Sequence, residues 1–423
     1  MNRRNRLLSL LPLLFLLQPA RAGDVTKAEH WPAWRGPHLD GTSRETGIPT
    51  RFSDTDNVRW KTRLPGRGYS SPIVWGDRVF VTWCLEDEEQ RVLACIDRKS
   101  GKILWQKTVL TAPLEQKHGL NSYASATPAT DGKHVWVAFL KKHDMVVACY
   151  DLDGKEVWRS SPGKLLSRHG FCSSPLLYKD TVLLNGDQDA QGYLVALDKA
   201  TGRERWRVNR PNQTRSYCTP VIVEAGGRTQ LVFSGSKCVT SYDPDSGKLL
   251  WIIDGPTEQY VASLVYAEGL FFLTTGYPEY HLMGIRPDGH GNVTQSHIAW
   301  HHAKLKPHEA SYVPSPIAQG RYFFVVSDQG FASCFEAKSG KRLWMQRLGK
   351  RHSASIVSIE GNLYSPADEG DVYVIKAGPK IELVAKNSLE GQCYASPAVA
   401  QGELFIRTTH YLYCIAAAQK EKK

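Results

Sequence analysis

The sequence predicts an all-β protein: an eight-bladed β-propeller of four-stranded antiparallel blades, closed by its N-terminal strand. Three observations predict this fold. A turn phrase ending in tryptophan recurs along the chain, a hydroxyl-rich phrase recurs before it, and the two ends of the repeat region are incomplete in complementary ways. The composition agrees, because 35 glycines and 23 prolines favour turns, while 12 tryptophans and 18 tyrosines favour strands.

The turn phrase combines an acid, a glycine turn, a lysine or arginine, and a tryptophan. Copies occupy residues 97–105, 151–158, 198–206, 243–251 and 336–344, and a degenerate copy occupies residues 286–300. The acid and a nearby hydroxyl can bond the backbone of the turn, and the glycine can take a positive φ. The phrase is therefore typical of a hairpin between two strands.

A second phrase precedes most of these copies and begins with an aromatic residue, followed by small or hydroxyl residues and usually a proline. It occupies residues 69–72, 171–175, 217–220, 312–316 and 394–397. A strand, a turn and another strand follow it. One period is thus four strands in roughly 40 to 53 residues, which is the size of a propeller blade.

The blade number follows from the residues that close each repeat. These are Trp60, Trp105, Trp158, Trp206, Trp251, Trp300, Trp344 and, in a weaker eighth position, Val384. The last repeat lacks a fourth strand and the strand around Trp60 lacks the preceding three, so joining them completes the ring. Seven blades remain the alternative if the copy near Arg286 or the one near Val384 is not a blade.

The chain is expected to divide into four parts. Residues 1–22 are predicted to be a signal peptide, 23–56 an N-terminal segment, 57–418 the propeller and 419–423 a charged tail. Arg3, Arg4 and Arg6 precede an apolar run that is too short to span a bilayer, and Ala20 and Ala22 fit a cleavage site. We therefore expect a periplasmic or secreted protein that does not span the membrane.

Charge and cysteine positions narrow the class of partner. Loss of the signal peptide would lower the formal net charge from +11 to +7, and no basic run interleaved with aromatics indicates nucleic-acid binding. The first cysteine is Cys84, so the predicted mature N-terminus offers no cysteine for a lipid anchor. A monomer is expected.

The turn phrase resembles the pyrroloquinoline quinone (PQQ) repeat of quinoprotein dehydrogenases and of the BamB-like propellers of outer-membrane assembly. The resemblance covers about residues 57–418. The opening residues 31–37 and the stretch 123–139 are similar to a secreted PQQ-like subgroup with no assigned activity.

The resemblance to the dehydrogenases implies PQQ held with calcium beneath a pair of adjacent cysteines. None of the nine cysteines here is adjacent to another, and neither the family's catalytic aspartate nor its calcium ligands can be placed. We therefore predict no cofactor. PQQ with calcium is expected only under the alternative hypothesis, that the protein is a divergent PQQ-dependent oxidoreductase. The short acidic loop of Asp187 and Asp189 lacks a distant carboxylate, so no metal site is predicted.

Cysteines also recur at one position of the repeat. Cys95, Cys149, Cys334 and Cys414 occupy a position that holds Ala196, Ser241 or Gly284 in other repeats. A position that accepts alanine, serine, glycine or cysteine requires a small buried side chain. Equivalent positions of different blades are too far apart to be bridged, so no disulfide framework is predicted.

The phrase before each innermost strand is expected to lie at one mouth of the central channel. Its polar and aromatic residues are the ligand-binding candidates: Arg67, Tyr69, His118, Asn121, Tyr123, Arg168, His169, Arg215, Tyr217, His308, Tyr312, Arg351, His352 and Tyr394. Convergent arginines and histidines with aromatic walls favour an anion or a sugar-like ring. The alternative is that each residue only packs blades or loops.

The sequence thus predicts an exported, non-catalytic binding or scaffold propeller. Its funnel would take a protein partner or a small anionic or saccharide ligand. The alternatives are a divergent PQQ-dependent oxidoreductase and an envelope-assembly scaffold, the latter weakened by the missing anchor cysteine. No catalytic residue is assigned, because nothing fixes the separation of Glu258 and Glu309, the acids expected in the mouth loops.

Overall fold

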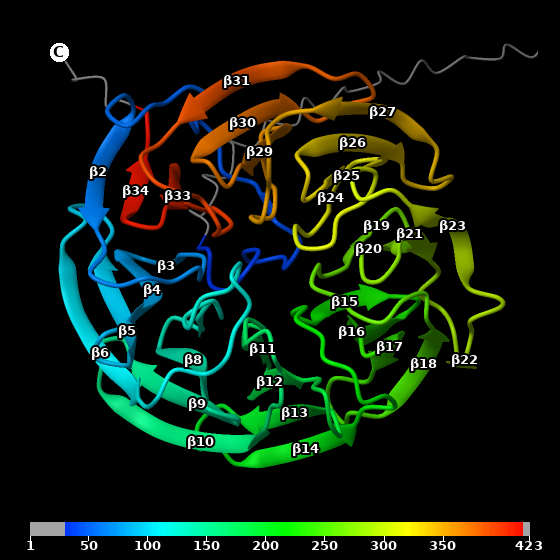
Figure 1. The fold of residues 1–423 in the computed structure, drawn as a ribbon, viewed down its shortest axis with the longest axis horizontal. Helices are drawn as coiled ribbons and strands as arrows, with labels where there is room; N and C mark the ends of the chain where they lie inside the picture. Colours follow the sequence, from blue (N-terminus) through cyan, green and yellow to red (C-terminus); the bar gives the residue numbers. More distant parts are fainter. Residues whose placement is uncertain (1–29, 418–423) are drawn as a thin grey trace, which may run out of the picture.

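The computed structural model describes residues 30–417, in which every regular element is a β-strand (Figure 1). Eight small sheets, each with a four-stranded antiparallel core, form a closed ring. The predicted eight-bladed propeller is therefore confirmed, and the seven-bladed alternative is wrong. No helix of residues 30–417 could span a membrane. The predicted signal peptide (residues 1–22) and charged tail (residues 419–423) lie outside the described residues.

Blades I to IV follow one another along the chain. Blade I comprises β3 (Ile73–Trp75), β4 (Arg78–Leu85), β5 (Gln90–Asp97) and β6 (Ile103–Thr111), and blade II comprises β7 (Ala129–Thr130), β8 (His134–Lys141), β9 (Asp144–Asp151) and β10 (Glu156–Lys164). Blade III comprises β11 (Leu176–Tyr178), β12 (Thr181–Gly186), β13 (Tyr193–Asp198) and β14 (Glu204–Asn209), and blade IV comprises β15 (Val221–Ala225), β16 (Arg228–Gly235), β17 (Cys238–Tyr242) and β18 (Leu249–Asp254).

Blades V to VIII complete the ring. Blade V comprises β19 (Val265–Ala267), β20 (Leu270–Thr275), β21 (Tyr280–Ile285) and β23 (Ile298–Leu305), and blade VI comprises β24 (Ile317–Gln319), β25 (Tyr322–Val326), β26 (Phe331–Glu336) and β27 (Arg342–Arg347). Blade VII comprises β28 (Val357–Ile359), β29 (Asn362–Pro366), β30 (Asp371–Lys376) and β31 (Leu383–Ser388). Blade VIII comprises β32 (Ala398–Ala400), β33 (Glu403–Arg407), β34 (Tyr411–Ile415) and, from the other end of the propeller, β2 (Val58–Arg63).

Two short strands extend blades in parallel. β1 (Thr42–Ser43) lies beside β28, and β22 (Gly291–Asn292) lies beside β18. The second and third strands of each blade are almost wholly buried, whereas the outermost strand is largely exposed. The core therefore lies between neighbouring blades.

The position that holds a small residue in the repeat lies directly opposite the repeat tryptophan. Cys95 pairs with Trp105, Cys149 with Trp158 and Cys414 with Trp60. Gly284 shows the reason, because a Cβ there would lie 2.5 Å from the indole of Trp300. In blade VII the residue at the tryptophan position is Ala385, opposite Val374, rather than Val384. All nine cysteines are unpaired.

Five of the seven repeat tryptophans also donate a hydrogen bond to a backbone carbonyl of the next blade: Trp60, Trp105, Trp158, Trp300 and Trp344. Trp251 donates to Gln230 of its own blade, and the indole N–H of Trp206 has no partner within residues 30–417. The indole N–H of Trp60 donates to the Arg98 carbonyl of blade I at 2.7 Å, and that of Trp158 donates to the Lys199 carbonyl of blade III at 2.8 Å. The ring of Trp158 packs against Gly202, which has φ +70°. The acid-glycine turn of one blade is thus the docking surface for the tryptophan of the preceding blade.

A ring of hydroxyl residues joins the blades at the channel, and we call it the hydroxyl ring. Its members, one per blade and each just before the innermost strand, are Ser71, Thr127, Ser174, Thr219, Ser263, Ser315, Ser355 and Ser396. From Ser71 to Ser355, each backbone N–H donates to the side-chain oxygen of the next member at 2.9–3.1 Å. Between blades VIII and I, Arg407 instead donates to Ser70 and Thr82.

The N-terminal residues 31–43 form a plug across the ring. Trp31 bridges to Val74 of blade I, and β1 pairs with Ser358 and Ile359 of blade VII on the other side. Figure 1 shows this blue segment crossing the centre. Its contacts lie beyond the hydroxyl ring along the innermost strands, so the plug occupies the end of the channel away from the predicted mouth.

The tryptophan–glycine docking predicts that Gly202→Ala destabilises the protein more than Gly227→Ala. Both glycines have positive φ, and a left-handed conformation costs an ordinary residue about 1–2 kcal/mol. A Cβ at Gly202 would lie 2.5 Å from Trp158, whereas one at Gly227 meets nothing within 4 Å. Overpacking should therefore add about 1–3 kcal/mol at Gly202 alone. Urea unfolding measures both variants, and equal losses would contradict the docking.

Candidate functional site

A cavity of about 770 Å³ opens at the predicted mouth of the channel, and we call it the funnel. Ten of the predicted residues line it: Tyr69, His118, Asn121, Arg168, His169, Arg215, Tyr217, Tyr312, Arg351 and Tyr394. Seven members of the hydroxyl ring line it as well, and Trp34 of the plug contributes to its deep end. The funnel thus runs from the mouth loops through the hydroxyl ring to the plug.

Four predicted residues lie outside the funnel. His352 is buried beside Ser365 and Tyr373, on the opposite side of the extended segment from Arg351, since successive side chains of extended backbone alternate. His308 contacts Phe331.

The other two residues outside the funnel belong to blades I and II. Tyr123 lies under Lys117, whose ammonium is 4.9 Å from the ring centre. Arg67 lines a separate hollow of about 300 Å³ with His410. These residues belong to the same phrase of the repeat as the funnel residues, but their side chains do not line the funnel.

The cationic lining residues gather on two sides of the funnel. Arg168 precedes blade III and Arg215 precedes blade IV, next to it. Lys350 and Arg351 precede blade VII, which is four blades from blade III and therefore opposite it in the eight-membered ring (Figure 1). Burial lowers the pKa of His169, which favours its neutral form. Arg168 is exposed and forms no hydrogen bond or ion pair with the rest of residues 30–417. The mouth therefore offers two separate cationic positions.

Tyrosines form the walls between these positions. Tyr69 and Tyr394 lie together with ring centres 4.5 Å apart. On the other wall, the Tyr312 hydroxyl donates to Oε1 of Gln259 at 3.2 Å, and the Tyr217 hydroxyl lies 3.0 Å from the Ser167 hydroxyl. These bonds hold the rings in place, so the walls are preformed.

Asp328 is the carboxylate among the funnel-lining residues. It lies in the turn between β25 and β26 and accepts the backbone N–H groups of Tyr312 at 2.7 Å and Val313 at 3.1 Å. Burial raises the pKa of Asp328 to about 6, against the opposing effect of these N–H groups and of Arg351. The negative charge of this carboxylate therefore changes near neutral pH.

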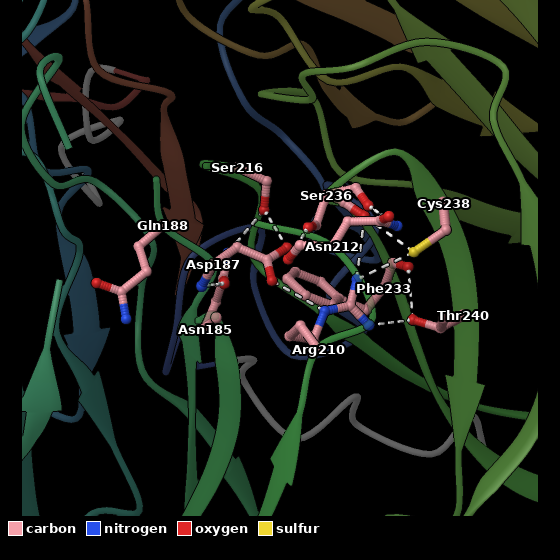
Figure 2. Close-up of polar contacts among 12 residues, drawn as sticks. Asn185, Asp187, Gln188, Arg210, Asn212, Ser216, Phe233, Ser236, Cys238 and Thr240 are labelled. Atoms are coloured by element: carbon pink, nitrogen blue, oxygen red, sulfur yellow. Dashed lines mark hydrogen bonds and ion pairs between the residues drawn. The ribbon is translucent and has the colours of Figure 1, made fainter. Parts of the chain in front are cut away.

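A buried ion pair holds the mouth loops of blades III and IV (Figure 2). Nε of Arg210 lies 2.9 Å from Oδ1 of Asp187, and both side chains are fully buried. The Ser216 hydroxyl donates to Oδ2 of Asp187 at 2.9 Å, and the guanidinium also donates to the Thr240 hydroxyl at 2.7 Å. Because Ser216 lies between Arg215 and Tyr217, this cluster positions two funnel residues.

The two carboxylates of the acidic loop both form ion pairs with arginines. Asp187 is paired with Arg210, and Asp189 forms an ion pair with Arg215. Within residues 30–417 there is no cluster of three or more histidine, cysteine or acidic residues placed to hold a metal ion.

The funnel lining does not fit calcium-held PQQ. Calcium takes about six to eight oxygen ligands, usually from several carboxylates, whereas the lining offers Asp328 facing arginines and lysine. Cys172 is the cysteine in the lining, and burial raises the pKa of its thiol to about 12. It has no adjacent cysteine partner, so the disulfide of the dehydrogenases has no counterpart here.

Sequence reasoning missed several lining residues. Asp328, Gln259, Tyr277 and Tyr280 come from other loops at the same mouth, and Trp34 comes from the plug. A signal existed for Asp328, because the turn between the second and third strands of an antiparallel blade returns to the end where the first strand begins. No sequence pattern indicated that Trp34 lines the funnel, because Trp34 belongs to no repeat.

Comparisons with known proteins agree with this fold. A sequence profile of the family described as outer membrane protein assembly factor BamB matches residues 50–107, 88–330 and 328–421. BamB of Burkholderia pseudomallei (strain K96243) is 31% identical over 109 residues, which cover 26% of this chain and 28% of that protein. The match thus spans little more than a quarter of that relative's length.

Solved structures resemble the whole propeller. BamB from Moraxella catarrhalis has a TM-score of 0.58 at 12% identity, over 84% of this chain and 99% of that one. Quinohemoprotein alcohol dehydrogenase from Comamonas testosteroni has a TM-score of 0.66 at 12% identity, over 93% and 82% of the two chains. At this identity the likeness shows the fold alone. Because the family profile covers most of the chain, the protein belongs to the family of PQQ-repeat β-propellers described as outer membrane protein assembly factor BamB.

Proposed function

We propose that this protein is an exported, non-catalytic binding propeller whose funnel takes a small anionic saccharide. The observation that carries the proposal is the pair of cationic positions on opposite sides of the mouth, with tyrosine walls between them. Guanidinium groups pair with carboxylate or sulfate oxygens, and tyrosine faces offer apolar surface to a sugar ring. A chain of acidic sugars presents both features at once.

The depth of the site favours a small ligand over a protein partner. The lining reaches from exposed Arg168 at the mouth to Trp34 of the plug, and its volume of about 770 Å³ lies within the range of about 300–1,000 Å³ typical of small-molecule sites. A flat protein surface would contact the mouth and leave the deep lining unused. A small ligand would therefore contact more of the funnel than a protein partner would.

We predict that hexagalacturonate binds the protein saturably with one-to-one stoichiometry, whereas neutral maltohexaose does not. The double variant Arg168→Ala with Arg351→Ala should bind at least ten-fold more weakly, because each lost charge-assisted bond is worth about 1.5–3 kcal/mol and about 1.4 kcal/mol corresponds to a factor of ten. Isothermal titration calorimetry measures both ligands.

Arg203→Ala is the matched control, because Arg203 is an exposed arginine in the turn phrase of blade III and does not line the funnel. It should bind as the parent does. Equal binding of maltohexaose, or full affinity in the double variant, would contradict the proposal. Cleavage of hexagalacturonate during incubation would contradict its non-catalytic part.

The affinity for this anion should fall as the pH rises from about 5 to about 7.5. Asp328, whose pKa burial raises to about 6, is neutral at the lower pH and places a negative charge in the funnel at the higher one, while the galacturonate carboxylates stay ionised throughout. Asp328→Asn should show a much smaller dependence. Calorimetry at both pH values tests this, and identical pH dependence of parent and variant would exclude Asp328 as its source.

A further inference from the structure

Two buried arginines beside the hydroxyl ring have no carboxylate within ion-pair distance among residues 30–417, although the charge of Asp40 opposes the lowering of the pKa of Arg35. Arg35 and Arg407 are 2% and 1% exposed, and neither forms an ion pair within residues 30–417. Nε and Nη1 of Arg35, and Nε and Nη2 of Arg407, have no hydrogen-bond partner there. Burial lowers the pKa of Arg35 to about 10 and that of Arg407 to about 9, so both remain charged at neutral pH.

The other buried arginines of the protein behave differently. Arg91 is paired with Glu115, Arg98 with Glu403, and Arg210 with Asp187. Burying a charge is costly unless an opposite charge or strong hydrogen bonds compensate it. Among residues 30–417, Arg35 and Arg407 are therefore the buried arginines that form no ion pair.

Both arginines reach residues adjacent to the ring. Nη1 of Arg407 donates to the carbonyl and hydroxyl oxygens of Ser70, the residue before Ser71, at 3.0 and 2.7 Å. Nη2 of Arg35 donates to the carbonyl of Pro316, the residue after Ser315, at 2.6 Å. One positive charge thus lies on the side of blades VIII and I, and the other on the side of blade VI.

The ring itself has hydroxyl protons to donate. Every hydroxyl oxygen of the ring except that of Ser71 accepts a backbone N–H group. Within residues 30–417, only the Ser263 hydroxyl donates onward, to the Thr219 carbonyl at 2.7 Å. The seven members that line the funnel are each less than 9% exposed and donate to no protein acceptor there. Buried donors without acceptors that surround one axis are suited to an oxyanion.

We propose that the hydroxyl ring is an anion-binding subsite at the floor of the funnel, which takes a single carboxylate, sulfate or phosphate group. The ring hydroxyls donate to its oxygens, and Arg35 and Arg407 supply the balancing charge from behind. This proposal rests on the proposed function for the identity of the funnel's ligand. It adds which group of that ligand enters the funnel first. It stands apart from the cationic positions at the mouth.

Sulfate is the first probe, titrated against the parent protein at constant ionic strength set with sodium chloride. We expect a saturable rise in the melting temperature, because a ligand that binds only the folded state stabilises it. Phosphate and acetate titrations then show which oxyanion source the subsite prefers. No saturable rise with any of the three would overturn the proposal.

Ser71→Asp and Ser71→Asn form the matched pair of variants, because the Ser71 hydroxyl forms no hydrogen bond with the rest of residues 30–417. The aspartate places a carboxylate at the floor and should abolish the sulfate-dependent rise, whereas the asparagine of equal size should retain it. An undiminished rise in Ser71→Asp would overturn the proposal.

The mouth variant, Arg168→Ala with Arg351→Ala, tests the subsite even if one of the Ser71 variants fails to fold. It should retain the sulfate response, and its loss there would place the sulfate at the mouth and overturn the floor subsite. A parent protein that binds hexagalacturonate without any sulfate response would retain the proposed function and lose only the subsite.

Discussion

Seven of the eight junctions between blades share one hydrogen bond, in which the backbone N–H of one hydroxyl-ring residue donates to the side chain of the next. At the junction of blades VIII and I, the guanidinium of Arg407 makes the corresponding contacts. Blades converge most closely at the channel, where only short strands and small side chains fit. A serine or threonine satisfies the neighbouring backbone without occupying the axis. The bulky tryptophans dock at the periphery, where the blades diverge and leave room for an indole.

This closure also shapes the site. Because every blade enters the channel through the same phrase, the loops before the ring converge on one mouth and the hydroxyls form the layer beneath them. The plug then covers the far end with Trp34 in the lining. The mouth loops can therefore differ from blade to blade, whereas the hydroxyl ring beneath them is constrained by its hydrogen bonds. This is how a repeat fold can carry a specific binding site.

The repeat explains which features the sequence could predict. The tryptophan, the glycine turn and the small position are local patterns that recur, so blade number and the seam at β2 could be inferred. Arg168 and Arg351 could be placed at the mouth because they precede innermost strands. Other features depend on contacts between residues that are distant in the sequence and belong to no repeat. These are the plug, the pairing of Asp187 with Arg210, and the buried guanidinium nitrogens of Arg35 and Arg407 that have no hydrogen-bond partner within residues 30–417.

The central claim is that the funnel of this propeller is built to hold an anion. Crystals of the protein grown with selenate and measured at the selenium absorption edge would locate bound oxyanions directly. We expect an anomalous peak within hydrogen-bond reach of the hydroxyl ring. Ordered selenate found only on the outer surface of the blades, with none in the funnel, would contradict the claim.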